Sequence, residues 1–163
     1  MTMNKIISFS FLLIFVLTAC GDQASKKKAE NKSTVVAKSG KVLSLPALPS
    51  EDMQRLYEEC DFTDYIFHNL PFSISQGEKA AIVKNLSFIS PDPAGEVTIT
   101  CKPMGREFFH IKGEIEYEAD VYFEEGCQYI VFMKGNTPIY LNKISEAGKK
   151  FYGSIISQNF SKQ

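Results

Sequence analysis

The sequence predicts an α+β fold with two N-terminal helices, an antiparallel β-meander of four to five strands, and a C-terminal helix packed on one face of the sheet. Apolar side chains recur at three- and four-residue spacing over residues 51–69 and 74–88, which is typical of amphipathic helices. The spacing changes to two over residues 109–123, which is typical of strands. A last apolar stripe, over residues 151–156, follows the strands and indicates a closing helix.

The first 20 residues carry the parts of an export signal. Lys5 precedes an apolar run, Ile6–Leu17, that is too short to span a membrane, because a spanning helix needs about 20 apolar residues. Thr18 and Ala19 then place two small residues directly before Cys20, as at a cleavage site. We therefore expect residues 1–19 to be removed during export.

The run Leu17-Thr18-Ala19-Cys20 resembles the lipobox of bacterial lipoprotein signal peptides, and the resemblance covers residues 1–22 only. It implies that the Cys20 sulfur carries a diacylglyceryl group and the new N-terminus a further acyl chain such as palmitate, which together give stable anchoring to membrane lipid. In that family an aspartate directly after the cysteine retains the protein in the inner membrane. Here Gly21 follows Cys20, so the resemblance implies the outer membrane, facing the periplasm, in a cell with two membranes.

The next segment differs in composition from the rest of the chain. Residues 21–48 hold six lysines against two acidic residues and show no apolar period, so we expect Cys20 and residues 21–48 to form a flexible lipidated tether. Residues 49–163 carry 11 basic and 17 acidic side chains, a net charge of −6. This acidic balance, without a basic patch, argues against nucleic acid as a partner.

Residues 49–163 are expected to form a single globular domain, since a chain of this length can build its own core. Ser50 is the predicted N-cap of the first helix, which runs to residue 69 and is ended by Pro71. Its apolar stripe consists of Met53, Leu56, Tyr57, Cys60 and Phe67. The run Ser73-Ile74-Ser75-Gln76 matches a capping box and predicts the start of the second helix.

The strands follow a turn at residues 91–95, and the first is predicted at 97–101. Over residues 109–123 every odd position is apolar or glycine. One unbroken strand from 107 to 123 would measure about 56 Å, which favours a hairpin with the three-residue loop Lys112-Gly113-Glu114 over a single strand bent near Gly113. Tyr129–Met133 is apolar on both faces and predicts a central strand, Gly135-Asn136 a tight turn, and Pro138–Ile144 the last strand before the closing helix.

An acidic row lies on the even positions of the alternating segment. The interpretation we favour is a solvent-facing strand side with Lys112 and Lys134 as cross-strand partners. The functional hypothesis is a surface for a basic partner or a loose cation site. The row consists of Glu114, Glu116, Glu118 and Asp120.

Three cysteines remain beyond Cys20, namely Cys60, Cys101 and Cys127. An exported protein meets oxidising conditions, so one disulfide and one spare thiol are expected. In a flat meander Cys101 and Cys127 would lie about 14 Å apart, too far for a disulfide, whereas Cys60 reaches either partner or stays a small core residue. The pairing is left open.

A soft-metal site is the sharper alternative for these residues. Cys101 and Met104 place a thiol and a thioether around one loop, with His110 on the next strand and Cys127 further along the chain. Such ligands suit copper, so a copper or haem carrier is the first alternative function.

The motifs of common enzymes are absent from the sequence. It contains no Gly-x-Ser-x-Gly, no His-Glu-x-x-His and no phosphate-binding glycine loop. The first hypothesis is therefore a lipid-anchored, extracytoplasmic and non-enzymatic accessory domain of the bacterial cell envelope, which needs no cofactor and meets another envelope protein. An enzyme whose site escapes recognition by motif is the second alternative.

Overall fold

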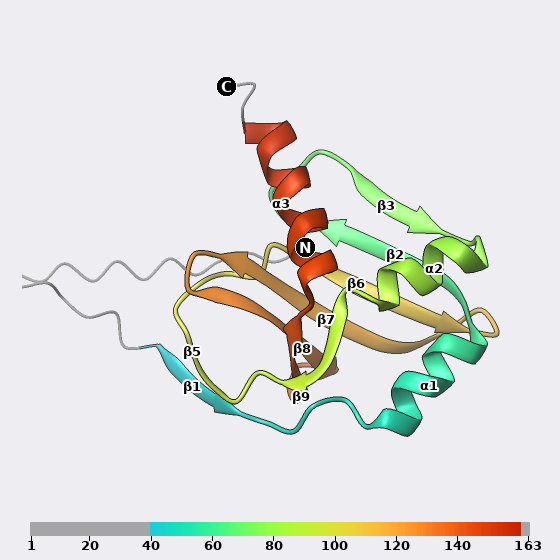
Figure 1. Cartoon of the computed structure of the whole chain (residues 1–163), viewed down its shortest axis with the longest axis horizontal. Helices are drawn as coiled ribbons and strands as arrows, with labels where there is room; N and C mark the ends of the chain where they lie inside the picture. Colours follow the sequence, from blue (N-terminus) through green and yellow to red (C-terminus); the bar gives the residue numbers. More distant parts are fainter. Residues whose placement is uncertain (1–39, 161–163) are drawn as a thin grey trace, which may run out of the picture. The chain divides into compact units, whose positions relative to one another are not determined.

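The computed structural model describes residues 40–160. The expected signal peptide, the lipidation site Cys20 and residues 21–39 of the expected tether lie outside the described residues. Residues 40–160 form a strongly curved antiparallel sheet with helices against one face and a two-stranded ribbon against the other (Figure 1).

The main sheet has seven strands in the order β3-β2-β6-β7-β8-β9-β4, and every neighbouring pair is antiparallel. β1 and β5 form a separate antiparallel pair. The bounds of the strands are β1 Lys41–Ser44, β2 Cys60–Phe67, β3 Ser73–Gln76, β4 Ile89–Pro93, β5 Glu96–Ile99, β6 Gly105–Ile111, β7 Glu114–Glu124, β8 Cys127–Lys134 and β9 Thr137–Ile144.

The predicted α+β class is wrong, because the described residues are mostly strand. Three helices occur among them: α1 Ser50–Glu59, α2 Lys79–Leu86 and α3 Glu146–Phe160. The predicted meander of four to five strands is likewise too small for the seven-stranded sheet. No helix among the described residues combines the length and the apolar character of a membrane span.

The two N-terminal helices are shorter than predicted, and the structure shows why. The helix predicted over 51–69 ends at Glu59, and the chain continues directly as β2, in which Thr63, Tyr65 and Phe67 point into the core. A register irregularity between Cys60 and Phe62 disturbs the two-residue period, so the apolar side chains also fit a helical stripe. The expected capping box at 73–76 is β3, and only residues 79–86 of the second predicted helix are helical.

The segment predicted as a hairpin forms the hairpin of β6 and β7. The turn has two residues instead of the predicted three, Lys112 and Gly113, both with positive φ, so that Ile111 faces Glu114 across the ladder. A two-residue turn reverses the alternation of side chains, and a bulge then restores it, because His110 pairs with Ile115 whereas Phe109 pairs with Tyr117.

The helices bury one face of the main sheet, here called the helix-side face. α3 lies across this face, and its Tyr152, 1% exposed, contacts the rings of Tyr65, Phe88 and Phe123. Leu56 of α1 and the apolar side of α2 complete this core. Burial of these large apolar side chains is the main favourable term in folding of the body.

The ribbon β1–β5 covers the other face over β7, β8 and β9 only. Leu43 of β1 packs there against Tyr122, Tyr129, Val131 and Leu141. Within residues 40–160 nothing similar covers the same face over β2 and β6, and its large side chains Phe62 and Ile66 are exposed. The sheet therefore has one covered face and one half-covered face.

The folded body begins earlier than expected, which corrects the predicted boundary of the tether at residue 48. Leu43 and Leu48 are buried, and Asn142 in β9 accepts a hydrogen bond from the Leu48 N–H at 2.9 Å. The Asn142 amide also donates to the Ser90 carbonyl at 2.9 Å. One buried amide thus ties the lead-in to α1 and the start of β4 to the sheet.

Candidate functional site

The uncovered half of the sheet presents apolar side chains to solvent. Phe62 and Ile66 of β2 are 37% and 45% exposed, and Ile115 of β7 is 56% exposed. Phe108 and His110 of β6 lie between them, half-buried, and the His110 and Phe62 rings meet edge to face at 5.4 Å. These five residues, called the open face below, lie on one side of the pleat. His110 pairs directly with Phe62 and Ile115, whereas Ile66 pairs with Arg106, and Phe108 with Asp64 and Glu118.

Ile115 belongs to the open face because of the bulge in β7. The two-residue alternation predicts that Ile115 lies on the same side of the strand as Ile111 and Tyr117, whose side chains face the core. The two-residue turn and the bulge together place Ile115 opposite His110 instead. One apolar side chain is thus moved from the core to the surface.

The predicted acidic row does not form one continuous surface. Glu118 and Asp120 lie beside the open face, where Arg106 donates to Glu118 at 2.9 Å and to both oxygens of Asp120 at 2.7 and 3.0 Å. Glu116 occupies the bulge and pairs at 2.6 Å with Arg55 of α1. The partners are arginines rather than the predicted Lys112 and Lys134, and the fork of Arg106 explains how Asp120 tolerates burial.

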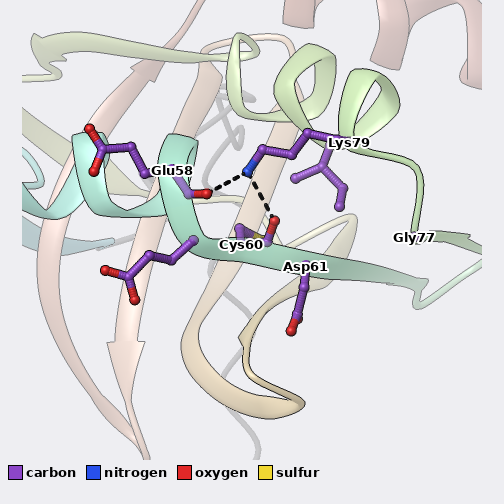
Figure 2. A pocket seen from close by; sticks show the side chains of 7 residues that line it. Glu58, Cys60, Asp61, Gly77 and Lys79 are labelled. Atoms are coloured by element: carbon purple, nitrogen blue, oxygen red, sulfur yellow. Dashed lines mark hydrogen bonds between the residues drawn. The ribbon is translucent and has the colours of Figure 1, made fainter.

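A hollow of about 310 Å³ lies where α1, β2 and α2 meet, and Figure 2 shows its residues. The Lys79 ammonium group donates to the carbonyl oxygens of Glu58 and Cys60 at 3.0 and 3.2 Å. Lys79 therefore completes the C-terminal end of α1, whose last carbonyl groups lack helical partners. The full lining is Glu58, Glu59, Cys60, Asp61, Gly77, Lys79 and Ile82.

Cys60 is the free cysteine of the described residues and is buried beside this hollow. Its thiol donates to the Phe62 carbonyl at 3.4 Å, and desolvation by burial raises its pKa. A nucleophilic cysteine needs a lowered pKa, so this thiol behaves as a small core side chain.

A buried acid lies on the helix-side face. Glu107 is 4% exposed, its carboxyl group forms no hydrogen bond or ion pair within residues 40–160, and burial raises its pKa to about 8. Its neighbour across the ladder is Tyr65, whose hydroxyl is buried without a partner there. Burial and the nearby Glu107 raise the pKa of Tyr152, which lies above them on α3.

Raised pKa values of this kind are frequent at catalytic sites, but a catalytic group must also be able to reach its substrate. A second, apolar hollow of about 210 Å³ opens at the end of this core. Phe123 lines it and contacts Tyr152 at 5.6 Å, whereas Glu107 is not among its lining residues. The lining comprises Asn69, Leu70, Met104, Phe123, Glu124 and Ile156.

Cys101 and Cys127 form a disulfide, with their Cα atoms 6.4 Å apart. The expectation of a disulfide is confirmed, and the objection of distance fails because Cys101 follows β5, which lies over the half-covered face instead of continuing the meander. Two of the four residues named for a metal are thus bonded to each other and offer no thiolate.

Met104 packs against the helix-side core, and His110 belongs to the open face. Within residues 40–160, no group of three or more His, Cys, Asp or Glu side chains lies close enough together to hold a metal ion.

Comparison with protein-family models, with curated proteins and with solved structures found no match to this chain.

Two features escaped the sequence prediction. The open face depends on which half of a sheet the ribbon covers, and no local pattern records that choice. Glu107 did leave a signal, because it shares the odd positions of Phe109 and Ile111 and so falls on the buried side of the strand. A charged residue at such a position indicates a buried acid.

Proposed function

We propose that this chain is a lipid-anchored, extracytoplasmic accessory protein of the bacterial cell envelope, and that its folded body binds another envelope protein through the open face. Acyl chains on Cys20 hold it to membrane lipid, on the periplasmic side of the outer membrane where the cell has two membranes. The body has a binding role and needs no cofactor for it.

The disulfide supports the extracytoplasmic part of this proposal. Disulfides persist in oxidising compartments and are rare in the bacterial cytoplasm. Cys101 lies two residues after β5 and Cys127 begins β8, so their bond fixes the end of the ribbon to the main sheet. It also withdraws both thiolates from the copper or haem hypothesis, which we do not carry further.

The open face is the observation that carries the binding role. Exposed apolar side chains that are contiguous, and not scattered singly, mark interaction sites on soluble domains. Phe62 and Ile115 meet this criterion, since they flank His110 across β2, β6 and β7, and Ile66 lies on the same side of β2, beyond Asp64. Within the described residues the ribbon leaves all three uncovered. The charged groups at its border, the fork of Arg106 with Glu118 and Asp120, are typical of the polar rim of an interface.

Site-specific photo-cross-linking in the native host tests this role. A benzophenone amino acid is placed at position 62, 66 or 115 and, as a control, at the exposed Lys150 of α3. The proposal expects one envelope protein, identified by mass spectrometry, to be cross-linked from all three open-face positions but not from position 150. The double variant Phe62→Ser/Ile66→Ser should abolish the cross-link from position 115.

The opposite outcome is equally clear. If no product forms at the three positions, or if position 150 gives the same product as they do, the open face is not the binding surface and the proposed function fails.

A further inference from the structure

We propose that the partner docks as an extended strand along the outer edge of β3, and that this strand alternates apolar and basic residues. The inference rests on the proposed function and names the kind of partner that the open face receives. It adds the backbone of β3 to the side chains described above.

The outer edge of β3 is open and unprotected. β3 ends the seven-stranded sheet and pairs only with β2 among the described strands (Figure 1). Its residues, Ser73–Gln76, include no proline and no charge, and its ladder with β2 has no bulge. Edge strands are normally protected by these devices against pairing with another chain.

The other end of the same sheet shows the contrast. β4 contains Pro91 and Pro93, which cannot donate to a ladder, and its register with β9 is irregular. A further strand is thus blocked beside β4, while β3 offers free N–H and C=O groups to one.

The side chains of β3 leave the open face accessible from this edge. Ser73 and Ser75 lie opposite Ile66 and Asp64, so they share the side of the pleat that carries the open face. Both side chains are small, and the Ser75 hydroxyl donates a hydrogen bond of 2.6 Å to Asp64, which keeps it close to the sheet. An added strand lies about 5 Å beyond β3, from where long apolar side chains reach across the two serines toward Ile66.

The charge around this edge selects a basic partner. Gly77, directly after β3, lines the same hollow as the acidic residues Glu58, Glu59 and Asp61. Two cations lie beside these three acids, because the Lys79 ammonium group donates to two carbonyl oxygens and Arg55 pairs with Glu59 at 3.8 Å. The acids therefore outnumber the cations by one. A lysine or arginine at the end of the added strand complements the hollow.

A second copy of the chain is less suited to the edge, because two bodies of the same acidic charge repel each other. We therefore commit to a different polypeptide as the occupant.

The probe is the fluorescein-labelled peptide KVKIKVK, titrated into the mature full-length protein and followed by fluorescence anisotropy. We expect saturable binding that is at least tenfold weaker for EVEIEVE, which reverses the charge. A KVKIKVK peptide N-methylated at alternate residues loses the donors on one side of its backbone and should also bind at least tenfold more weakly. Binding of the methylated peptide at the original affinity overturns the inference.

Protein variants locate the contact. Ser73→Lys adds an edge-protecting charge and should weaken binding at least tenfold, whereas Ser73→Thr, its matched control, should leave the affinity within about twofold. Hydrogen exchange should slow at residues 73–76 when KVKIKVK is bound. Exchange that slows elsewhere but not on β3, or dimerisation of the free chain that Ser73→Lys abolishes, contradicts the inference.

The two proposals fail separately. If the partner is no longer cross-linked in Phe62→Ser/Ile66→Ser but is still cross-linked in Ser73→Lys, the proposed function is supported and the strand addition is contradicted. Absence of the cross-linked partner sinks the proposed function, whatever the peptide does.

Discussion

Glu107 places a carboxyl group on the helix-side face among side chains that offer it no hydrogen bond within the described residues. An unpaired buried charge is costly, so the group is retained in its neutral form at neutral pH. The single change that relieves this cost is protonation, which couples the stability of the body to pH.

The sign of that coupling follows from the raised pKa. Burial shifts the Glu107 pKa from an ordinary 4.5 to about 8 in the folded chain. The free energy of unfolding should therefore be highest below pH 4.5 and fall as the pH rises to about 8, by about 3–5 kcal/mol from this group. Urea unfolding of wild type and Glu107→Gln at pH 5 and 8.5 measures it.

The difference in the free energy of unfolding between pH 5 and pH 8.5 should shrink by this amount in Glu107→Gln, because glutamine mimics the neutral acid. Glu114→Gln, at an exposed position, should keep the wild-type difference. Equal pH dependence in wild type and Glu107→Gln would show that Glu107 is not a buried acid.

The Cys101–Cys127 bond is the other feature that acts at the scale of single residues. It closes a loop with a sequence separation of 26, for which chain entropy predicts a stabilisation of about 3.5 kcal/mol. Adding a reductant should lower the free energy of unfolding of the wild type by about this amount and leave Cys101→Ala/Cys127→Ala unchanged.

Cys60→Ala is the matched control. It should lose about 1 kcal/mol through the cavity that it leaves and remain sensitive to the reductant. A wild type whose unfolding is indifferent to the reductant would contradict the disulfide.

At the scale of elements, the sequence predicted strands more reliably where no helical spacing competed with the strand pattern. β8 and β9 match their predicted runs because Tyr129–Met133 is apolar on both faces and Gly135, at positive φ, makes the turn. Ser145 caps the start of α3, since its hydroxyl accepts a hydrogen bond from the Gly148 N–H at 3.1 Å.

β2 and β3 were missed because their signals compete with a helical one. The aromatic and β-branched residues of β2, among them Phe62, Thr63 and Ile66, favour a strand. The buried residues Cys60, Thr63 and Phe67, however, are also spaced to continue the stripe begun in α1. β1 and β4 are short and pair with distant partners, so long-range contacts decide them and local pattern does not. The open face, which depends on these strands, could not be predicted.

The close approach of β2 and β6 depends on Gly105. A Cβ atom there would lie 2.5 Å from the Ile66 carbonyl oxygen and 2.8 Å from the Tyr65 ring, so the two strands must separate to admit it. Gly105→Ala should lower the free energy of unfolding by about 2–3 kcal/mol, measured by urea unfolding.

Gly113→Asn supplies the comparison, because the turn is open and asparagine tolerates positive φ. It should cost about 1 kcal/mol or less. If the two variants lose the same amount, the tight packing of β2 on β6 is contradicted.

At the scale of the whole molecule, the proposed function depends on where the body is held. The described residues carry 11 basic and 17 acidic side chains, so the body itself is repelled by an anionic membrane surface. The acyl chains that we propose on Cys20 would keep it near the bilayer nevertheless.

The mass of the mature protein, isolated with membranes from its native host, tests this account most directly. The account predicts a chain that begins at Cys20 and carries a diacylglyceryl group and an N-acyl chain, recovered in the outer membrane where the host has one. An unmodified Cys20 thiol on a protein recovered free of membranes would contradict it.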